Sequence, residues 1–466
     1  MDFQEAIEKR TKWYEDNYSL SETAAGGDAF EDLCKFYVEN GPWGKTSGAV
    51  VWKWKDPANP LRLNASNEKD RLPQDTGCDL VAQTPDGEYY VIQCKYYPNS
   101  QLTLDSAHLS NVSTLATRYS IPQKHVIFCY VAKSVSSQAE SVLSHYTCFR
   151  EDDLGNPDFD WAPMFGEKKR SSKELRDYQK KAIEACIEGF KAEEYEGKRQ
   201  VGKLIMACGT GKTFTALGLA KKLSEGKPYT VLFMAPSIAL VSQTFQAWAL
   251  EEDISSLIVC SDSTAGTGKG MDEDEMDETV SDISSPDVTT DAEEMARKWK
   301  KIEGQNKVLR VVFSTYQSIE AVKEFQEKTG VKFDLTICDE AHRTASRAEA
   351  NFARAAEPGY IDTVKKLFMT ATPKIYSDAV KDKAEEEYAT VLYSMDDEEK
   401  YGPEFYRFGF GEAVDQGVLC DYRVLILAMR KGAEELKDIQ SLVKGTEAAT
   451  IAASPRRRGS SSPATP

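Results

Sequence analysis

Several features of metal-rich, secreted or membrane proteins are scarce in these 466 residues. Only 4 histidines occur, and the 10 cysteines stand singly with no CxxC pair, so neither a zinc site nor a disulfide framework is predicted. We expect reduced core thiols instead. No apolar run is long enough to cross a bilayer, and the first residues lack the apolar core of a signal peptide. We therefore expect no membrane contact, a cytoplasmic location, and oxygen ligands for any metal, as Mg²⁺ prefers.

Basic residues are outnumbered, and the formal net charge is −17 at pH 7. This excess of negative charge argues against a protein that coats nucleic acid through charge alone, but it permits an enzyme that binds DNA in a local groove. Much of the excess acid lies in residues 272–294, within an expected acidic loop at 262–298. We interpret this run as solvated; a partner-binding or DNA-mimicking role is the alternative.

Composition and periodicity divide the chain into regions. The length implies two or three domains. The first region shows helical periodicity and then strands. In the second, short apolar strands alternate with amphipathic helices, which predicts a parallel sheet covered on both faces, so the fold class is α/β. The expected boundaries are 1–155 for a first domain, 156–172 for a linker, 173–398 for a second domain, 399–452 for a hinge and the start of an incomplete second lobe, and 453–466 for a disordered tail.

A glycine-rich turn follows the first strand of the second region. Residues 207–213 read ACGTGKT, between strand-like and helix-like segments. Such a turn exposes backbone N–H groups to phosphate oxygens, and glycine is needed because side chains would block the approach. The residues expected to bind ATP are Gly209, Thr210, Gly211, Lys212 and Thr213. Lys212 would reach the β- and γ-phosphates and Thr213 would bind Mg²⁺, although Met206 stands where the strict pattern has glycine.

A pair of carboxylates follows a later apolar strand. Residues 339–342 read DEAH directly after LTIC. A carboxylate at the carboxyl end of a strand can hold Mg²⁺, and a second can polarise the attacking water. We therefore assign Asp339 to the metal and Glu340 to the catalytic base.

Together these motifs resemble those of the superfamily-2 helicases and translocases, whose lobes are RecA-like. Four further segments strengthen the resemblance, and each carries an implied role. In the first, Leu175-Arg176-Asp177-Tyr178-Gln179, the resemblance implies that Gln179 recognises adenine. Two segments are implied to contact DNA: Ala235-Pro236-Ser237 with Leu240 and Gln243, which would lie on the DNA backbone, and Ser314-Thr315-Tyr316-Gln317-Ser318. The fourth, Thr370-Ala371-Thr372-Pro373, is implied to couple ATP hydrolysis to DNA binding. For Thr370 and Thr372 the alternative is ordinary capping at a strand end.

The first region carries a second group of polar residues. Pro85-Asp86-Gly87 separates two strand-like runs, which predicts a hairpin. Gln93 and Lys95 are two apart and so share one face of a strand, while Asp79 begins the preceding strand. Asp79 could hold Mg²⁺ at a scissile phosphate, and Lys95 could orient water or neutralise developing charge. An ordinary edge hairpin is the alternative.

This pattern resembles the PD-(D/E)xK nuclease fold in its Mrr-like variant, in which glutamine replaces an acid. The resemblance implies that Glu31, near the start of a helix, restores the missing charge, and Asp75 is a further candidate ligand. The expected architecture is then a restriction-endonuclease-like mixed sheet followed by a RecA-like parallel-sheet P-loop domain.

The order of nuclease then motor is similar to that of type ISP restriction enzymes and of type I motor subunits. The resemblance implies double-stranded DNA as partner, together with methyltransferase and target-recognition domains or subunits. We find no Q-x-x-G-R-x-x-R-like stretch, and residues 401–428 resemble the hinge into a second lobe. We therefore expect a truncated or frame-shifted chain that binds ATP but hydrolyses it weakly, since arginine fingers are missing.

Three hypotheses stay open. The first is a restriction-type, ATP-dependent endonuclease that translocates along duplex DNA. The second is a repair or recombination helicase-nuclease, which would differ in its response to target methylation. The third is an ATP-gated DNA-binding module without turnover, which would show no metal-dependent nicking.

Overall fold

The structure is a computed structural model that describes residues 1–63, 77–98, 103–192, 200–261, 283, 285–345, 351–378, 380–381 and 391–421. The chain divides into two compact units, Met1–Leu419 and Cys420–Pro466. All elements below lie in the first unit, and the expected tail at 453–466 lies outside the described residues. Within the first unit we call residues 1–166 the first domain and residues 177–419 the second domain.

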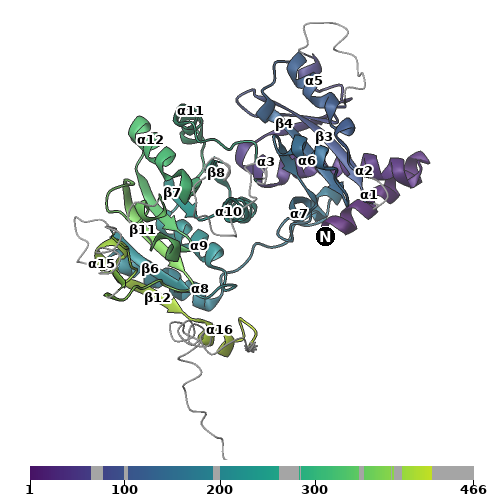
Figure 1. The fold of residues 1–466 in the computed structure, drawn as a ribbon. Helices are drawn as coiled ribbons and strands as arrows, with labels where there is room; N and C mark the ends of the chain where they lie inside the picture. The colour runs from purple at the N-terminus through teal and green to yellow at the C-terminus, as the bar shows by residue number, and fades with distance from the viewer. Residues whose placement is uncertain are drawn as a thin grey trace, which may run out of the picture. The chain divides into compact units, whose positions relative to one another are not determined.

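The first domain is built on a five-stranded sheet of order β1-β2-β3-β4-β5 (Figure 1). Its strands are β1 Val50–Lys53, β2 Leu80–Gln83, β3 Tyr89–Tyr97, β4 Val126–Ala132 and β5 Thr147–Phe149. The first three strands pair antiparallel, and β3, β4 and β5 pair in parallel, so the sheet is mixed as expected. The predicted hairpin turn between β2 and β3 is present, with Gly87 at φ +88°.

Helices cover both faces of this sheet because successive strand residues point to opposite sides. The helices are α1 Phe3–Tyr18, α2 Glu22–Asn40, α3 Pro42–Ser47, α4 Pro60–Leu63, α5 Ser110–Arg118, α6 Ser137–Leu143 and α7 Glu151–Leu154. On β3, Tyr90, Ile92 and Cys94 pack in the core that contains α1 and α2. Val91 packs in the other core, which contains α5 and α6.

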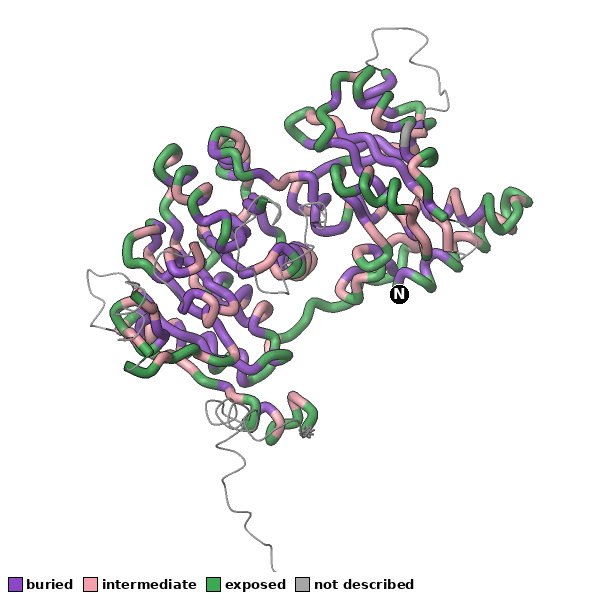
Figure 2. Tube along the Cα trace, viewed as in Figure 1, coloured by how far each residue is buried: buried purple, intermediate pink, exposed green. Residues whose placement is uncertain are grey.

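The second domain contains a seven-stranded sheet of order β12-β6-β11-β10-β7-β9-β8, with every neighbouring pair parallel. Its strands are β6 Gln200–Met206, β7 Tyr229–Ala235, β8 Ile254–Val259, β9 Leu309–Thr315, β10 Phe333–Cys338, β11 Thr363–Thr370 and β12 Glu404–Phe408. Most residues of both sheets are buried (Figure 2). The α/β prediction is confirmed for both domains.

Two helical layers cover the second sheet. The helices are α8 Asp177–Phe190, α9 Lys212–Ser224, α10 Ile238–Glu251, α11 Ala292–Glu303, α12 Ile319–Thr329, α13 Asn351–Arg354, α15 Glu398–Tyr401 and α16 Phe410–Asp415. Residues of α8, α9 and α10 share one core with the sheet, and residues of α11 and α12 share the other. Among the described residues, no helix is both long and apolar enough to cross a membrane.

Three segments differ from the boundaries that the sequence predicted. Phe159 and Trp161, expected in a linker, are buried in the core of the first domain, so that domain extends beyond residue 155. The end of the expected acidic loop belongs to α11, whose Met295 and Trp299 are buried. Strand β12, expected in a hinge, pairs with β6 as the edge of the second sheet.

Candidate functional site

The glycine-rich turn joins β6 to α9 as predicted. Gly209 and Gly211 have φ of +78° and +79°, the left-handed region that glycine adopts without strain. Gly211 is also the N-cap of α9, so the free backbone N–H groups of the first helical turn face the loop. A Cβ atom on Gly211 would lie 2.6 Å from Nε2 of Gln179. Glycine therefore provides both the backbone conformation and the space.

Lys212 lies beside the DEAH segment. Its Nζ is 3.4 Å from Oε1 of Glu340 and 3.5 Å from the carbonyl oxygen of Met206, and its side chain is 9% exposed. The candidate phosphate-binding lysine and the candidate base, 128 positions apart in the chain, thus meet at the carboxyl edge of the sheet. A nucleotide phosphate would compete with Glu340 for this ammonium group.

The two carboxylates of the DEAH segment have opposite pKa shifts. Burial, with repulsion from Glu340, raises the pKa of Asp339 to about 6. A hydrogen bond with His342 and the charge of Lys212 lower the pKa of Glu340, despite its burial. A cation bound beside Asp339 would favour its ionised form and lower its raised pKa again, while protein groups already favour the ionised form of Glu340.

His342 connects two motifs that the sequence showed only separately. Its Nδ1 lies 3.4 Å from Oε2 of Glu340 and 3.1 Å from Oγ1 of Thr370. The backbone N–H of Thr372 donates to the same threonine oxygen, at 3.3 Å. Lys212, Glu340, His342 and Thr370 therefore form a continuous polar chain. The contacts of His342 were not predicted from the sequence, although its position within DEAH, next to Glu340, was a signal for them.

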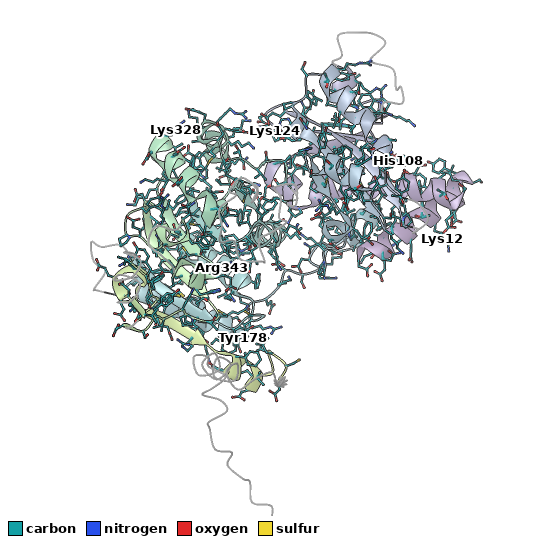
Figure 3. All side chains as sticks on the ribbon, viewed as in Figure 1. Lys12, His108, Lys124, Tyr178, Lys328 and Arg343 are labelled. Carbon is teal, nitrogen blue, oxygen red and sulfur yellow. The ribbon has the colours of Figure 1, made fainter. Side chains whose placement is uncertain are left out.

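The other predicted motor residues lie around the same edge. Gln179 caps α8 by accepting from the N–H of Arg176, and its Nε2 lies 3.3 Å from the carbonyl oxygens of both Thr210 and Gly211. Tyr178, labelled in Figure 3, donates to the Thr210 carbonyl at 2.9 Å. The candidate adenine-sensing residue therefore contacts the glycine-rich turn directly.

The candidate DNA-contacting residues also follow strand ends. Pro236 and Ser237 come directly after β7, and Ser237 caps α10 through a bond from the N–H of Leu240 at 3.4 Å. Thr315 ends β9 and donates to Oγ of Ser318 at 3.1 Å. Thr213 lies in the first turn of α9, where its carbonyl accepts from Trp248.

In the first domain the most informative side chain is Gln93. It is 2% exposed, and its Oε1 accepts no hydrogen bond from any described residue. A buried acceptor without a partner costs roughly 1–3 kcal/mol, so it marks a place where a ligand would be stabilised. Gly77 faces this amide, because a Cβ there would lie 3.2 Å from Nε2 of Gln93.

Asp79 lies against the same stretch of β3. Its Oδ2 accepts from the N–H of Cys94 at 2.7 Å, and Cys94 stands between Gln93 and Lys95. Glu31 lies within electrostatic range of Asp79. Burial, followed by repulsion from Asp79, raises the pKa of Glu31 to about 7. Two carboxylates thus lie within electrostatic range of each other next to the strand that carries Gln93, and carboxylate and amide oxygens are donors suited to Mg²⁺.

The remaining predicted nuclease residues differ in their surroundings. Lys95 is half-buried and makes no ion pair with the residues that the structure describes, so its ammonium group is available. Glu31 lies 3.7 Å from Nζ of Lys53, which also pairs with Asp32 at 2.6 Å. Asp75 lies outside the described residues.

The two sites define a class of protein: a mixed-sheet nuclease-type domain joined to a parallel-sheet helicase-type domain. Comparison with known families supports both halves. Residues 39–171 match the family described as "Restriction endonuclease", and residues 172–375 match "Type III restriction enzyme, res subunit". The predicted combination of an Mrr-like nuclease domain with a superfamily-2 helicase domain is confirmed.

Individual relatives agree with this assignment. The chain is 27% identical over 289 residues to the probable helicase A859L of African swine fever virus, covering 60% of this chain and 27% of that protein. It is 23% identical over 262 residues to the type I restriction enzyme EcoAI endonuclease subunit of Escherichia coli, covering 55% and 24%. Among solved structures it is similar to the ATP-dependent type ISP restriction-modification enzyme LlaBIII bound to DNA, with a TM-score of 0.70, 30% identity, and coverage of 95% of this chain and 27% of LlaBIII. The chain thus spans about a quarter of the length of these relatives.

Proposed function

We propose that this chain is the nuclease and ATP-binding part of an ATP-dependent DNA endonuclease and translocase of a restriction-modification system. Its partners would be duplex DNA, ATP with Mg²⁺, and methyltransferase and target-recognition domains or subunits. The observation that carries the proposal is the buried Gln93 acceptor beside Asp79, in a domain that matches a restriction endonuclease family. LlaBIII, which resembles 95% of this chain, is described as bound to DNA.

The nuclease chemistry would use the residues of β2, β3 and α2. Asp79, Gln93 and Glu31 would hold Mg²⁺, which polarises a scissile phosphate and lowers the pKa of a bound water. Glu31, with its pKa near 7, can give up a proton when the cation binds. Lys95, which no described carboxylate neutralises, would offset the charge that develops on the phosphate.

The motor chemistry would use the polar chain at the second sheet. Phosphate oxygens would replace Glu340 at Lys212, which frees this carboxylate to orient water. Asp339 and Thr213 would hold Mg²⁺. Because His342 touches both Glu340 and Thr370, a change at the nucleotide would reach the Thr370-Ala371-Thr372-Pro373 segment, which leads away from β11.

The decisive experiment compares Lys95→Ala with Lys55→Ala. Lys55 is an exposed lysine of the same domain, so both variants lose one positive charge. We expect Mg²⁺-dependent cleavage of duplex DNA to fall at least ~100-fold in Lys95→Ala and to stay within about twofold in Lys55→Ala. Equal cleavage by Lys95→Ala and the unaltered chain would show that the nuclease assignment is wrong. A chain that binds nucleotide but never nicks DNA would instead be an ATP-gated binding module.

A repair or recombination role is the other alternative, and methylation separates it. A restriction system must spare DNA modified at its own target, whereas a repair enzyme has no need to do so. The test uses the complete system, with duplexes that carry or lack methylated target adenines. Equal cleavage of methylated and unmethylated duplexes would favour a repair or recombination role.

A further inference from the structure

Three thiols lie together in the core of the first domain. The Sγ atoms of Cys34, Cys94 and Cys129 all lie within 4.8 Å of one another, and all three side chains are buried. Cys94 and Cys129 are direct partners in the parallel β3–β4 register, and Cys34 reaches them from α2. Single buried cysteines act as small apolar residues, but close packing of three sulfur atoms places three potential ligands around one point.

We propose that Cys34, Cys94 and Cys129 form a binding site for a soft, thiophilic cation of the Cu⁺ class. Sulfur atoms bound to a central ion at about 2.3 Å would lie roughly 4 Å apart in a plane, which is compatible with Sγ atoms that all lie within 4.8 Å of one another. Structural zinc takes four ligands, whereas the described residues supply three here. Thiolates select Cu⁺ among the biological cations because both are soft.

A monovalent cation also suits the surroundings. The three cysteines belong to a core cluster that also contains Phe30, Leu33, Ile92 and Ile127, and the carboxylates of Asp79 and Asp153 lie within electrostatic range, so a large negative charge would be unfavourable. Cu⁺ balances the charge of one thiolate, so a neutral centre requires that the other two sulfur atoms coordinate while they keep their protons. Each thiol that ionises on binding releases its proton to the solvent, so binding strengthens as the pH rises.

The position of the site gives it a consequence for the candidate nuclease centre. Cys94 lies between Gln93 and Lys95, and its N–H donates to Asp79. Cys34 lies three residues after Glu31 on α2, about one helical turn away. A bound cation would tie α2 to β3 and so fix the spacing of the residues proposed to bind Mg²⁺. This effect on cleavage rests on the proposed function, whereas copper binding itself does not.

The test measures copper retained by the full chain. The protein is incubated anaerobically with Cu⁺ and then challenged with excess bicinchoninate, which removes copper from isolated exposed cysteines. We expect the unaltered chain to keep about one copper per molecule and X-ray absorption to show three sulfur neighbours. Cys129→Ala and Cys34→Ala should bind at least ~10-fold more weakly.

Cys148→Ala is the matched control, because Cys148 is buried in the same domain but packs in the other core. It should retain copper as the unaltered chain does. The proposal is overturned if the unaltered chain keeps no copper, if Cys129→Ala keeps a full equivalent, or if Cys148→Ala loses as much as Cys129→Ala. Cys129→Ser repeats the test if the alanine variant unfolds, and nucleotide binding by the second domain verifies that each variant is intact. If the chain retains copper but bound copper does not change DNA cleavage, the copper site is supported and only its proposed effect on the nuclease centre is contradicted.

Discussion

The two candidate centres of this chain differ in how their polar side chains are satisfied. In the second domain Lys212, Glu340, His342 and Thr370 bond to one another, so the site is organised before any ligand arrives. In the first domain Gln93 Oε1 lacks a partner among the described residues, and Glu31 and Asp79 repel each other. A ligand at the centre of the second domain would replace internal contacts, whereas a cation at the centre of the first domain would offset the repulsion between Glu31 and Asp79.

The sharpest test of this difference is Gln93→Leu. Leucine removes an unsatisfied acceptor, so we expect the free energy of unfolding to stay the same or to rise by up to about 1 kcal/mol. Mg²⁺-dependent cleavage should fall at least ~100-fold in the same variant. Thermal unfolding and cleavage of duplex DNA measure the two effects. Gln93→Glu is the control, since it supplies a carboxylate and should retain cleavage. A variant that loses both stability and cleavage would show that Gln93 has a structural role.

The second test addresses the centre of the second domain, whose polar side chains bond to one another. Lys212→Ala removes the ammonium group proposed to bind phosphate, and we expect ATP affinity to fall roughly 10–100-fold. Titration with a fluorescent ATP analogue gives the dissociation constant. Lys222→Ala, an exposed lysine on the same helix, should bind nucleotide normally. Unchanged affinity in Lys212→Ala would contradict the P-loop assignment.

The pH dependence of stability offers a third test. The pKa of Glu31 is raised to about 7 in the folded protein, so the folded state binds this proton more tightly than the unfolded state does. Stability should therefore fall as the pH rises from about 4.5 to about 7, by up to roughly 3 kcal/mol. Glu31→Gln cannot bind this proton, so its free energy of unfolding relative to that of the unaltered chain should increase as the pH rises from about 4.5 to about 7. Urea unfolding from about pH 5 to about pH 8 gives the difference, and Mg²⁺ should reduce it. A constant difference would show that Glu31 ionises normally.

The smallest effect concerns the edge of the second sheet. A Cβ on Gly202 would lie 2.1 Å from the Phe405 ring of β12, so Gly202→Ala should destabilise the protein by about 1–3 kcal/mol through overpacking. Gly411→Ala should instead stabilise it by about 0.5–1 kcal/mol, because a Cβ in α16 meets no neighbour within 4 Å. Denaturant unfolding compares the two variants. Equal effects would mean that β12 does not pack on β6.

The sequence predicted the motifs better than the boundaries. Short apolar strands were expected throughout the second domain, and β6 and β10 stand where the sequence predicted them, directly before the glycine-rich turn and the DEAH segment. β12 was assigned to a hinge, since EFYRF has no long apolar run and is half exposed on a sheet edge. Phe159 and Trp161 were assigned to a linker because neighbouring prolines and lysines hid their burial.

By itself, the sequence determined the order of the two domains, the strand and helix periodicity, and which residues stand at strand ends. These are local properties, fixed by side-chain type and spacing. Only the tertiary structure decided that His342 joins Glu340 to Thr370, that Gln93 keeps an unsatisfied oxygen, and that Cys34 meets Cys94 and Cys129. Such contacts depend on strand register and helix placement, and a register shift of one residue would turn the strand side chains Gln93, Cys94 and Cys129 to the opposite face of the sheet.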